Sequence, residues 1–176
     1  MGAFIEIENK DIDTKKRELI FKQYNRFFGD IPEHLRLLGN VDPDILSDFM
    51  KWNMKLMRNK NFHPDLLTFI RVHIATEFNY NYCKHFNTNF LIQKGYSPEI
   101  ISAITSMDNF PMPQKQIVLA KKAKKAIYNS SSFGENDLQE LYGLGWEIKE
   151  IYDVIEHIGV FEKNSRFIRA FLKQKN

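Results

Sequence analysis

Cysteine is the scarcest residue in this sequence, because Cys83 is the only one among 176 residues. A lone thiol excludes an internal disulfide and a zinc site built from several thiolates. The chain also lacks an apolar run near the ~20 residues that span a bilayer. Its first residues lack the charged-then-apolar pattern of a secretion signal. These absences predict a cytoplasmic protein with no membrane partner.

A strong excess of charge of one sign is also lacking, because the formal net charge is only +3. Four clustered lysines, at positions 121, 122, 124 and 125, alternate with apolar residues and no aromatic ones. This pattern favours a solvated helix face over a nucleic-acid site. The sequence has no glycine-rich phosphate loop, and its histidines lack metal-ligand spacing. We therefore expect no nucleic acid, metal or cofactor. Asp153 and His157 are one helical turn apart, and we interpret them as a surface or interface pair.

Hydrophobic residues make up 43% of the chain and aromatic residues 14%, enough for one compact domain over residues 1–176. Their spacing is helical, and no run alternates apolar with polar residues. The sequence thus predicts an all-α fold. The expected helices cover residues 14–28, 31–38, 42–58, 63–95, 97–104, 114–128, 136–142, 149–160 and 165–173, with loops at 108–113 and 129–134.

A weak internal repeat is visible at a constant offset. Gly95 and Tyr96, followed by an apolar helix, correspond to Gly145 and Trp146 in a second copy. Glycine at such a junction accepts the left-handed backbone that ends many helices. The repeat predicts a helix-turn-helix unit used twice, with a structural role.

The segment around Cys83 allows two geometries. In an unbroken helix, Cys83 lies at the margin of a face shared by His73 and Glu77, and His85 points away from it. If the helix instead breaks near Asn79 and restarts, Cys83 lies near a helix N-terminus, where the dipole favours a thiolate. Only the second geometry makes the cysteine intrinsically reactive.

Two interpretations of these side chains remain open. Cys83 is either a nucleophile or a small buried apolar residue, and His73 with Glu77 either moves protons or is an ordinary ion pair. Tyr80 and Tyr82 either belong to the core or line a pocket for a small apolar ligand. The catalytic candidates are Cys83, Glu77, His73 and His85.

At this point the chain resembles the carboxymuconolactone decarboxylase and alkylhydroperoxidase D-like family over most of its length. The resemblance rests on the order and spacing of several segments rather than on one motif. These are residues 29–35 and 42–49 near the N-terminus, 66–101 in the centre, and 143–155 with 164–166 near the C-terminus.

The family implies an all-helical, oligomeric fold. Its peroxidases carry a CxxC pair, a histidine four residues after it, and an upstream glutamate that relays protons. By this resemblance the second cysteine falls on Cys83, the first on Tyr80, the histidine on Asn87 and the glutamate on Thr68. Asn87 also departs from the histidine of the decarboxylases. We expect Tyr80, Tyr82, Asn87 and Thr68 to line the site.

The resemblance implies that any peroxide reduction is one-cysteine chemistry at Cys83, because the two-cysteine cycle is lost. A sulfenic acid formed there needs an external thiol or another copy's sulfur. We expect a peroxidase-like antioxidant activity or, as the alternative, a non-catalytic helical oligomer that binds a small apolar ligand or a protein. A lyase-like reaction of Glu77 and His73 is a third hypothesis. The large apolar residues near the C-terminus, such as Phe161, Phe167 and Phe171, predict a homo-oligomer.

Overall fold

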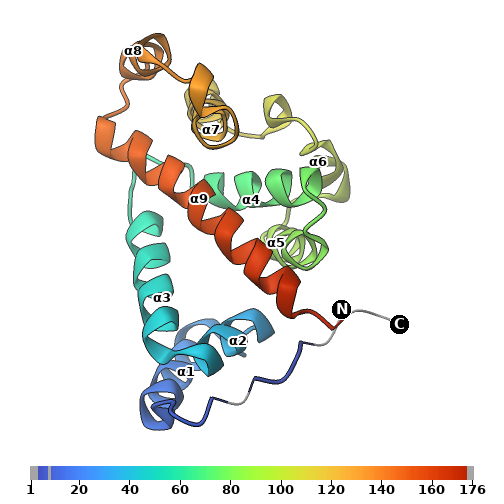
Figure 1. Ribbon diagram of the computed structural model, residues 1–176. Helices are drawn as coiled ribbons and strands as arrows, with labels where there is room; N and C mark the ends of the chain where they lie inside the picture. Colours follow the sequence, from blue (N-terminus) through green and yellow to red (C-terminus); the bar gives the residue numbers. More distant parts are fainter. Residues whose placement is uncertain (1–3, 8, 174–176) are drawn as a thin grey trace. The chain divides into compact units, whose positions relative to one another are not determined.

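Helices form the ordered backbone in the computed structural model, which describes residues 4–7 and 9–173 (Figure 1). Within those residues, extended pairing is limited to one isolated bridge between Phe4 and Leu172. The all-α prediction is therefore confirmed. The described residues divide into an N-terminal unit, up to Asn59 together with 171–173, and a central unit, Lys60–Ala170. That residues 1–176 act as one domain stays a prediction.

The N-terminal unit contains α1 (Thr14–Phe28), α2 (Glu33–Val41) and α3 (Pro43–Met57). Asp13 and Asp42 cap α1 and α3 by accepting hydrogen bonds from backbone N–H groups of their first turns. Gly39 of α2 sits so close to Phe21 of α1 that an added Cβ would lie 2.8 Å from the ring. Glycine at this position thus leaves room for the Phe21 ring.

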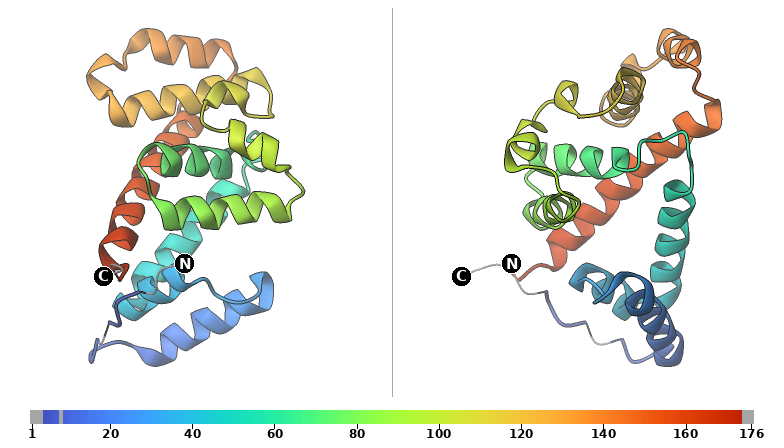
Figure 2. Two further views of the ribbon diagram at one scale, coloured as in Figure 1. Left: turned by 90° about the vertical axis from the view of Figure 1, so that its right-hand side faces the viewer. Right: turned by 180° about the vertical axis from the view of Figure 1, so that it is seen from behind.

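The central unit contains α4 (Leu66–Glu77), α5 (Asn81–Gln93), α6 (Pro98–Ala103), α7 (Gln114–Tyr128), α8 (Glu135–Gly143) and α9 (Ile148–Phe171, of which the unit includes all but the last residue). Two short 3₁₀ turns, Met107–Asn109 and Ser130–Ser132, lie in the connections around α7. Figure 2 shows α4 beside α5 and α7 beside α8. The core includes the fully buried side chains of Phe69, Leu91, Leu119 and Ile158.

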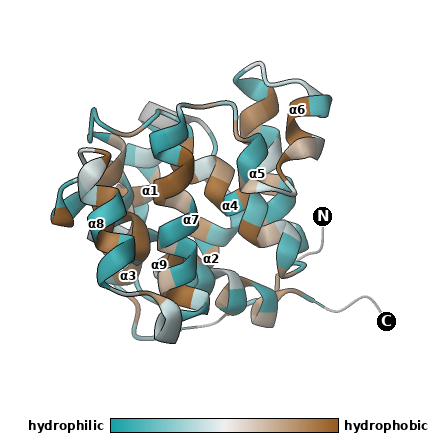
Figure 3. Ribbon diagram, turned by 90° about the horizontal axis from the view of Figure 1, so that it is seen from above, coloured by the Kyte–Doolittle hydropathy of each residue, from teal (hydrophilic) through white to brown (hydrophobic). Residues whose placement is uncertain are grey.

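The helices of both units carry apolar and polar residues together, as Figure 3 shows for α6 and α8. Apolar residues at helical spacing face the core, and the remaining positions face solvent. Across residues 4–7 and 9–173, the structure contains no helix with the length and apolar character needed to span a membrane.

Several predicted boundaries were wrong. The two helices expected at 149–160 and 165–173 are one continuous helix, α9. No proline lies between Val160 and Ser165 to break it, and Arg166 Nε pairs with Glu162 across one turn at 2.7 Å. The helix expected at 31–38 begins at Glu33 because Pro32 is its N-cap in extended conformation. The expected loop at 129–134 contains one 3₁₀ turn, and the other begins at Met107, one residue before the expected loop at 108–113.

The predicted repeat is confirmed at the level of single hydrogen bonds. Gly95 and Gly145 have φ angles of 92° and 84°. The N–H of Tyr96 donates to the carbonyl of Leu91 at 3.1 Å, and the N–H of Trp146 donates to that of Leu141 at the same distance. Both copies are therefore Schellman motifs, in which a left-handed residue ends the helix.

A third Schellman motif separates α4 from α5, with asparagine in place of glycine. Asn79 has a φ of 56°, and the N–H of Tyr80 donates to the carbonyl of Ala75 at 2.9 Å. The broken-helix geometry is thus the one adopted. Its new N-cap is Tyr80, without a side-chain cap bond, rather than Asn79 or Asn81.

Because Asn79 holds a left-handed backbone, a β-branched residue there should destabilise the fold. We expect Asn79→Val to lower the free energy of unfolding by about 1–2 kcal/mol, whereas Asn79→Gly should match or exceed the wild type. Urea denaturation of the three proteins measures both effects. Equal stability of the valine and glycine variants would contradict the assignment of the turn.

Candidate functional site

Cys83 lies in the first turn of α5, two residues after the helix begins at Asn81. Its side chain is buried, with 5% of the residue exposed. The Asn79 turn produces this position because it reverses the chain just before α5. The sulfur therefore lies near backbone N–H groups that have no partner within the helix.

Two other helices carry polar side chains that influence the ionisation of the sulfur. Arg71 of α4 contributes a positive charge, and Ser165 of α9 brings a buried hydroxyl that favours ionisation of the thiol although its oxygen lies outside hydrogen-bond range of any described partner. Burial raises the pKa of the Cys83 thiol, and Ser165, Arg71 and the residue's own backbone N–H oppose that rise without cancelling it. At neutral pH the group is therefore mainly the thiol, with a nearby charge that favours ionisation.

Arg71 is held by a histidine of α9. Its Nε donates a hydrogen bond to Nε2 of His157 over 3.1 Å. His157 is only 1% exposed, and Asp153 is buried too, with Lys149 paired to it at 2.7 Å. The interpretation of Asp153 and His157 as a surface or interface pair was wrong. We call Arg71, Cys83, His157 and Ser165 the Cys83 centre.

A second polar group lies one turn before Cys83. The hydroxyls of Tyr80 and Tyr128 donate to the two carboxylate oxygens of Glu162, at 2.6 and 2.7 Å. Burial opposes ionisation of Glu162, but these hydrogen bonds and Arg166 outweigh it and lower its pKa. Burial first, and then Glu162, raises the pKa of Tyr80. Glu162 is therefore a carboxylate that binds Tyr80 to α9.

His73 and Glu77 do lie together, as their spacing predicts. His73 Nε2 is 3.3 Å from Glu77 Oε2, and its Nδ1 is 2.9 Å from the carbonyl oxygen of Ile104. Lys124 of α7 contacts both the ring and the carboxylate. Burial, with Lys124, lowers the pKa of His73 despite Ile104 and Glu77. This group is anchored by α7, whereas the Cys83 centre is built from α4, α5 and α9.

The clustered lysines prove to be paired with carboxylates. Lys121 contacts Asp108, Lys124 contacts Glu77, and Lys122 and Lys125 share Asp137. Only Lys121 is exposed, and the other three are half-buried. Ion pairing within the chain thus accounts for the cluster, and the predicted solvated face holds for Lys121 but not for the three half-buried lysines.

The remaining predicted site residues divide by burial. His85 is exposed and lies 3.0 Å from Asn89 of the same helix. Asn87 is buried and donates from Nδ2 to the carbonyl oxygen of Cys83 at 2.8 Å. Tyr82 and Thr68 are also buried. Their role in lining a ligand site stays a prediction.

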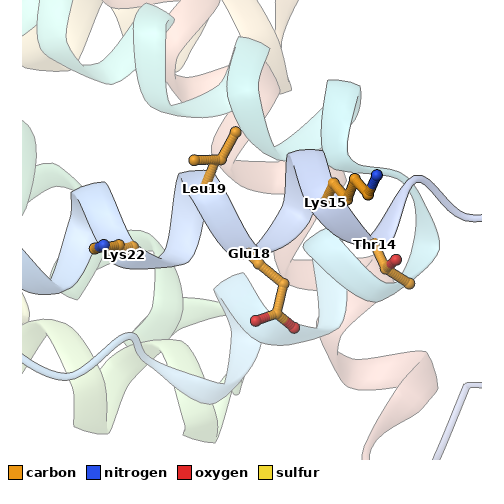
Figure 4. Close-up of a pocket in the computed structure, with 5 residues that line it drawn as sticks. All are labelled: Thr14, Lys15, Glu18, Leu19 and Lys22. Carbon is orange, nitrogen blue, oxygen red and sulfur yellow. The ribbon is translucent and has the colours of Figure 1, made fainter.

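A surface pocket of about 560 Å³ lies elsewhere, along one helix of the N-terminal unit. All the lining side chains in Figure 4 come from α1: Thr14, Lys15, Glu18, Leu19 and Lys22. Over the described part of the chain, no three His, Cys, Asp or Glu side chains gather closely enough to hold a metal ion.

Sequence reasoning missed four members of these groups: Arg71, Tyr128, Glu162 and Ser165. A signal for Arg71 was present, since it is a charged residue within the apolar run of 66–75. A buried position of that kind needs a partner. Glu162 and Ser165 gave no such signal because they fall where two helices, rather than one, were expected.

Comparison with known proteins supports the fold. A structure described as an uncharacterized peroxidase-related protein from Silicibacter sp. TM1040 has a TM-score of 0.76 and 19% identity, covering 92% of this chain and 85% of that one. A second is described as an alkylhydroperoxidase AhpD core, an uncharacterized peroxidase-related protein from Ralstonia eutropha JMP134. It has a TM-score of 0.76 and 16% identity, covering 99% of this chain and 93% of that one.

No family model and no curated protein matches this sequence. At 16 and 19% identity the two structures show the fold alone. The chain has the helical fold of an AhpD core, as the sequence predicted.

The buried imidazole of His157 should make stability depend on pH. Burial, followed by the nearby charge of Arg71, holds its pKa well below 6.5. As the pH falls below about 6.5, His157 binds a proton in the unfolded chain but stays neutral in the folded state. The folded state then loses about 1.4 kcal/mol per pH unit. We expect His157→Gln to flatten this dependence.

Urea unfolding of wild type and His157→Gln at about pH 7 and about pH 5 measures the difference. The other histidines are common to both proteins, so their contributions cancel in the comparison. Equal pH slopes would show that His157 is protonated in the folded state.

Proposed function

We propose that this chain is a one-cysteine member of the carboxymuconolactone decarboxylase and alkylhydroperoxidase D-like family that reduces hydroperoxides at Cys83 with an external thiol. The observation that supports this most directly is the Cys83 centre itself. A sulfur in the first turn of a helix has a guanidinium and a hydroxyl as neighbours. These groups favour a thiolate, which is the nucleophilic form of cysteine.

The proposed reaction has three steps. The Cys83 thiolate attacks the terminal peroxide oxygen, the O–O bond breaks, and the sulfur becomes a sulfenic acid while the alkoxide leaves and is protonated to the alcohol. An external thiol then displaces water from the sulfenic acid and forms a mixed disulfide. A second external thiol attacks that disulfide, which regenerates Cys83 and releases the oxidised reductant.

An external reductant is needed because the position of the partner sulfur is otherwise occupied. By the family resemblance, Tyr80 stands where the first cysteine of the pair would be. Its hydroxyl donates to Glu162, so it serves to bind α5 to α9. Thr68 and Asn87, at the positions of the relay glutamate and histidine, are buried but carry no titratable group.

These substitutions should make the reaction slow at neutral pH. Burial raises the pKa of Cys83 above its ordinary value of 9.0, so the thiolate fraction rises with pH across the neutral and alkaline range. Turnover should increase in parallel. A rate that levels off near neutral pH would instead indicate an acidic thiol and contradict this part of the proposal.

Cys83→Ser should abolish thiol-dependent consumption of an organic hydroperoxide. The assay follows peroxide loss in the presence of added monothiol, with purified full-length protein. Asn89→Ser, at an exposed position on the same helix, is the matched control and should retain the wild-type rate. Unchanged turnover in Cys83→Ser would rule out sulfur chemistry at this site.

A second candidate function is favoured by the burial of the same residue. A thiol that is 5% exposed, with a raised pKa, also suits a non-catalytic member that binds a small apolar ligand or a protein. In that case native Cys83 would resist alkylation, and a ligand would raise the melting temperature without turnover. Alkylation of the native protein therefore discriminates between the two functions.

We also propose that the chain forms homo-oligomers. The aromatic residues that first suggested this, Phe161, Phe167 and Phe171, are half-buried. Exposed apolar side chains occur instead at Ile148 and Tyr152, one turn apart on α9. Such a pair is a common element of interfaces between copies.

Sedimentation equilibrium should give a mass above that of one chain, and Tyr152→Lys should weaken the association. Lys163→Glu, at an exposed position further along α9, serves as the control. A wild-type monomer at micromolar concentration would contradict the proposal. Unchanged association in Tyr152→Lys would place the interface elsewhere.

A further inference from the structure

The orientation of Arg71 is determined by the residue that receives its Nε–H. A guanidinium has donors but no acceptor, so His157 Nε2, 3.1 Å away, must present a lone pair. The ring proton then resides on Nδ1. His157 is therefore a neutral imidazole with one defined tautomer.

A buried charge needs such a neighbour. Burial lowers the pKa of Arg71 to about 10, and the interaction with Cys83 opposes that change. The same interaction favours ionisation of Cys83. The charge on Arg71 and the sulfur thus influence each other, and the strength of this influence depends on where the guanidinium is held.

We propose that His157 is a positioning residue of the Cys83 centre, which fixes the guanidinium of Arg71 beside the sulfur by accepting its Nε–H. This inference rests on the proposed function of Cys83 as the reactive group. Arg71 belongs to α4 and His157 to α9, so the pair also links two of the three helices that surround the thiol. The imidazole makes no direct contribution to the chemistry.

Other groups near the sulfur also affect its ionisation, so the test must separate their effects from the effect of His157. Ser165 of α9 and the backbone of α5 also favour the thiolate. Tyr80 and Glu162 lie one turn earlier and form their own hydrogen bond. Loss of His157 should leave these groups in place and should affect the sulfur through Arg71.

The measurement is the rate of Cys83 alkylation by iodoacetamide as a function of pH, in the full-length protein. With Arg71→Met or His157→Leu, we expect the rate near neutral pH to fall on the order of tenfold and the profile to move to higher pH, since a nearby opposite charge shifts a pKa by about one unit or more. His157→Gln should restore the wild-type profile, because its amide oxygen can accept from Arg71. Lys163→Ala, exposed on α9, should change nothing.

Three results would overturn the inference. An unmoved profile in Arg71→Met would remove the influence of the charge, and an unmoved profile in His157→Leu would remove that of the imidazole. A glutamine variant that behaves like the leucine variant would show that the hydrogen bond is not what matters. If the variants do not fold, ¹⁵N spectra of the wild-type histidines decide, because a proton on Nε2 of His157 contradicts the proposal and a proton on Nδ1 supports it.

The peroxide assay separates this inference from the proposed function. If alkylation shifts as expected and no hydroperoxide is consumed, the positioning role stands and the peroxidase function fails. If peroxide turnover depends on Cys83 and the alkylation profile is unchanged in the His157 variants, the proposed function is supported and the positioning role is contradicted.

Discussion

The left-handed turn at Asn79 is the constraint on which the Cys83 centre depends. With a φ of 56° at this residue, α4 ends at Glu77 and α5 begins at Asn81. A continuous helix would place Cys83 in the middle of a hydrogen-bonded ladder. The turn instead brings it to a first helical turn and folds α5 back beside α4 (Figure 2), the helix that carries Arg71. Asparagine suits this position because it tolerates the left-handed region better than most residues.

Two opposing effects then act on the sulfur. The helix start and the guanidinium favour a thiolate, whereas burial favours the neutral thiol, and burial is the larger effect. The position of a cysteine near a helix N-terminus is therefore insufficient to make it acidic. In a catalytic site, titratable neighbours would add to the favourable side. Here Thr68 and Asn87 leave Arg71 as the principal charge beside the thiol.

The long helix α9 supplies what α4 and α5 lack. It brings His157 to Arg71 and Glu162 to Tyr80 through hydrogen bonds. Each of these contacts joins residues more than 80 positions apart, and each satisfies or modifies a polar group that would otherwise be costly to bury. The polar part of the centre is thus a product of three helices, none of which contains it alone.

The sequence determined the helical content, the two glycine turns and the position of Cys83 near a possible helix break. These follow from local rules of spacing, capping and backbone freedom, which act within a few residues. The choice between an unbroken and a broken helix at Asn79 was decided by the fold, since both were locally acceptable. So was the pairing of Arg71 with His157, because no local pattern relates residues so far apart. The burial of Cys83 was also decided by the fold, because only the packed structure excludes water from the thiol and so raises its pKa.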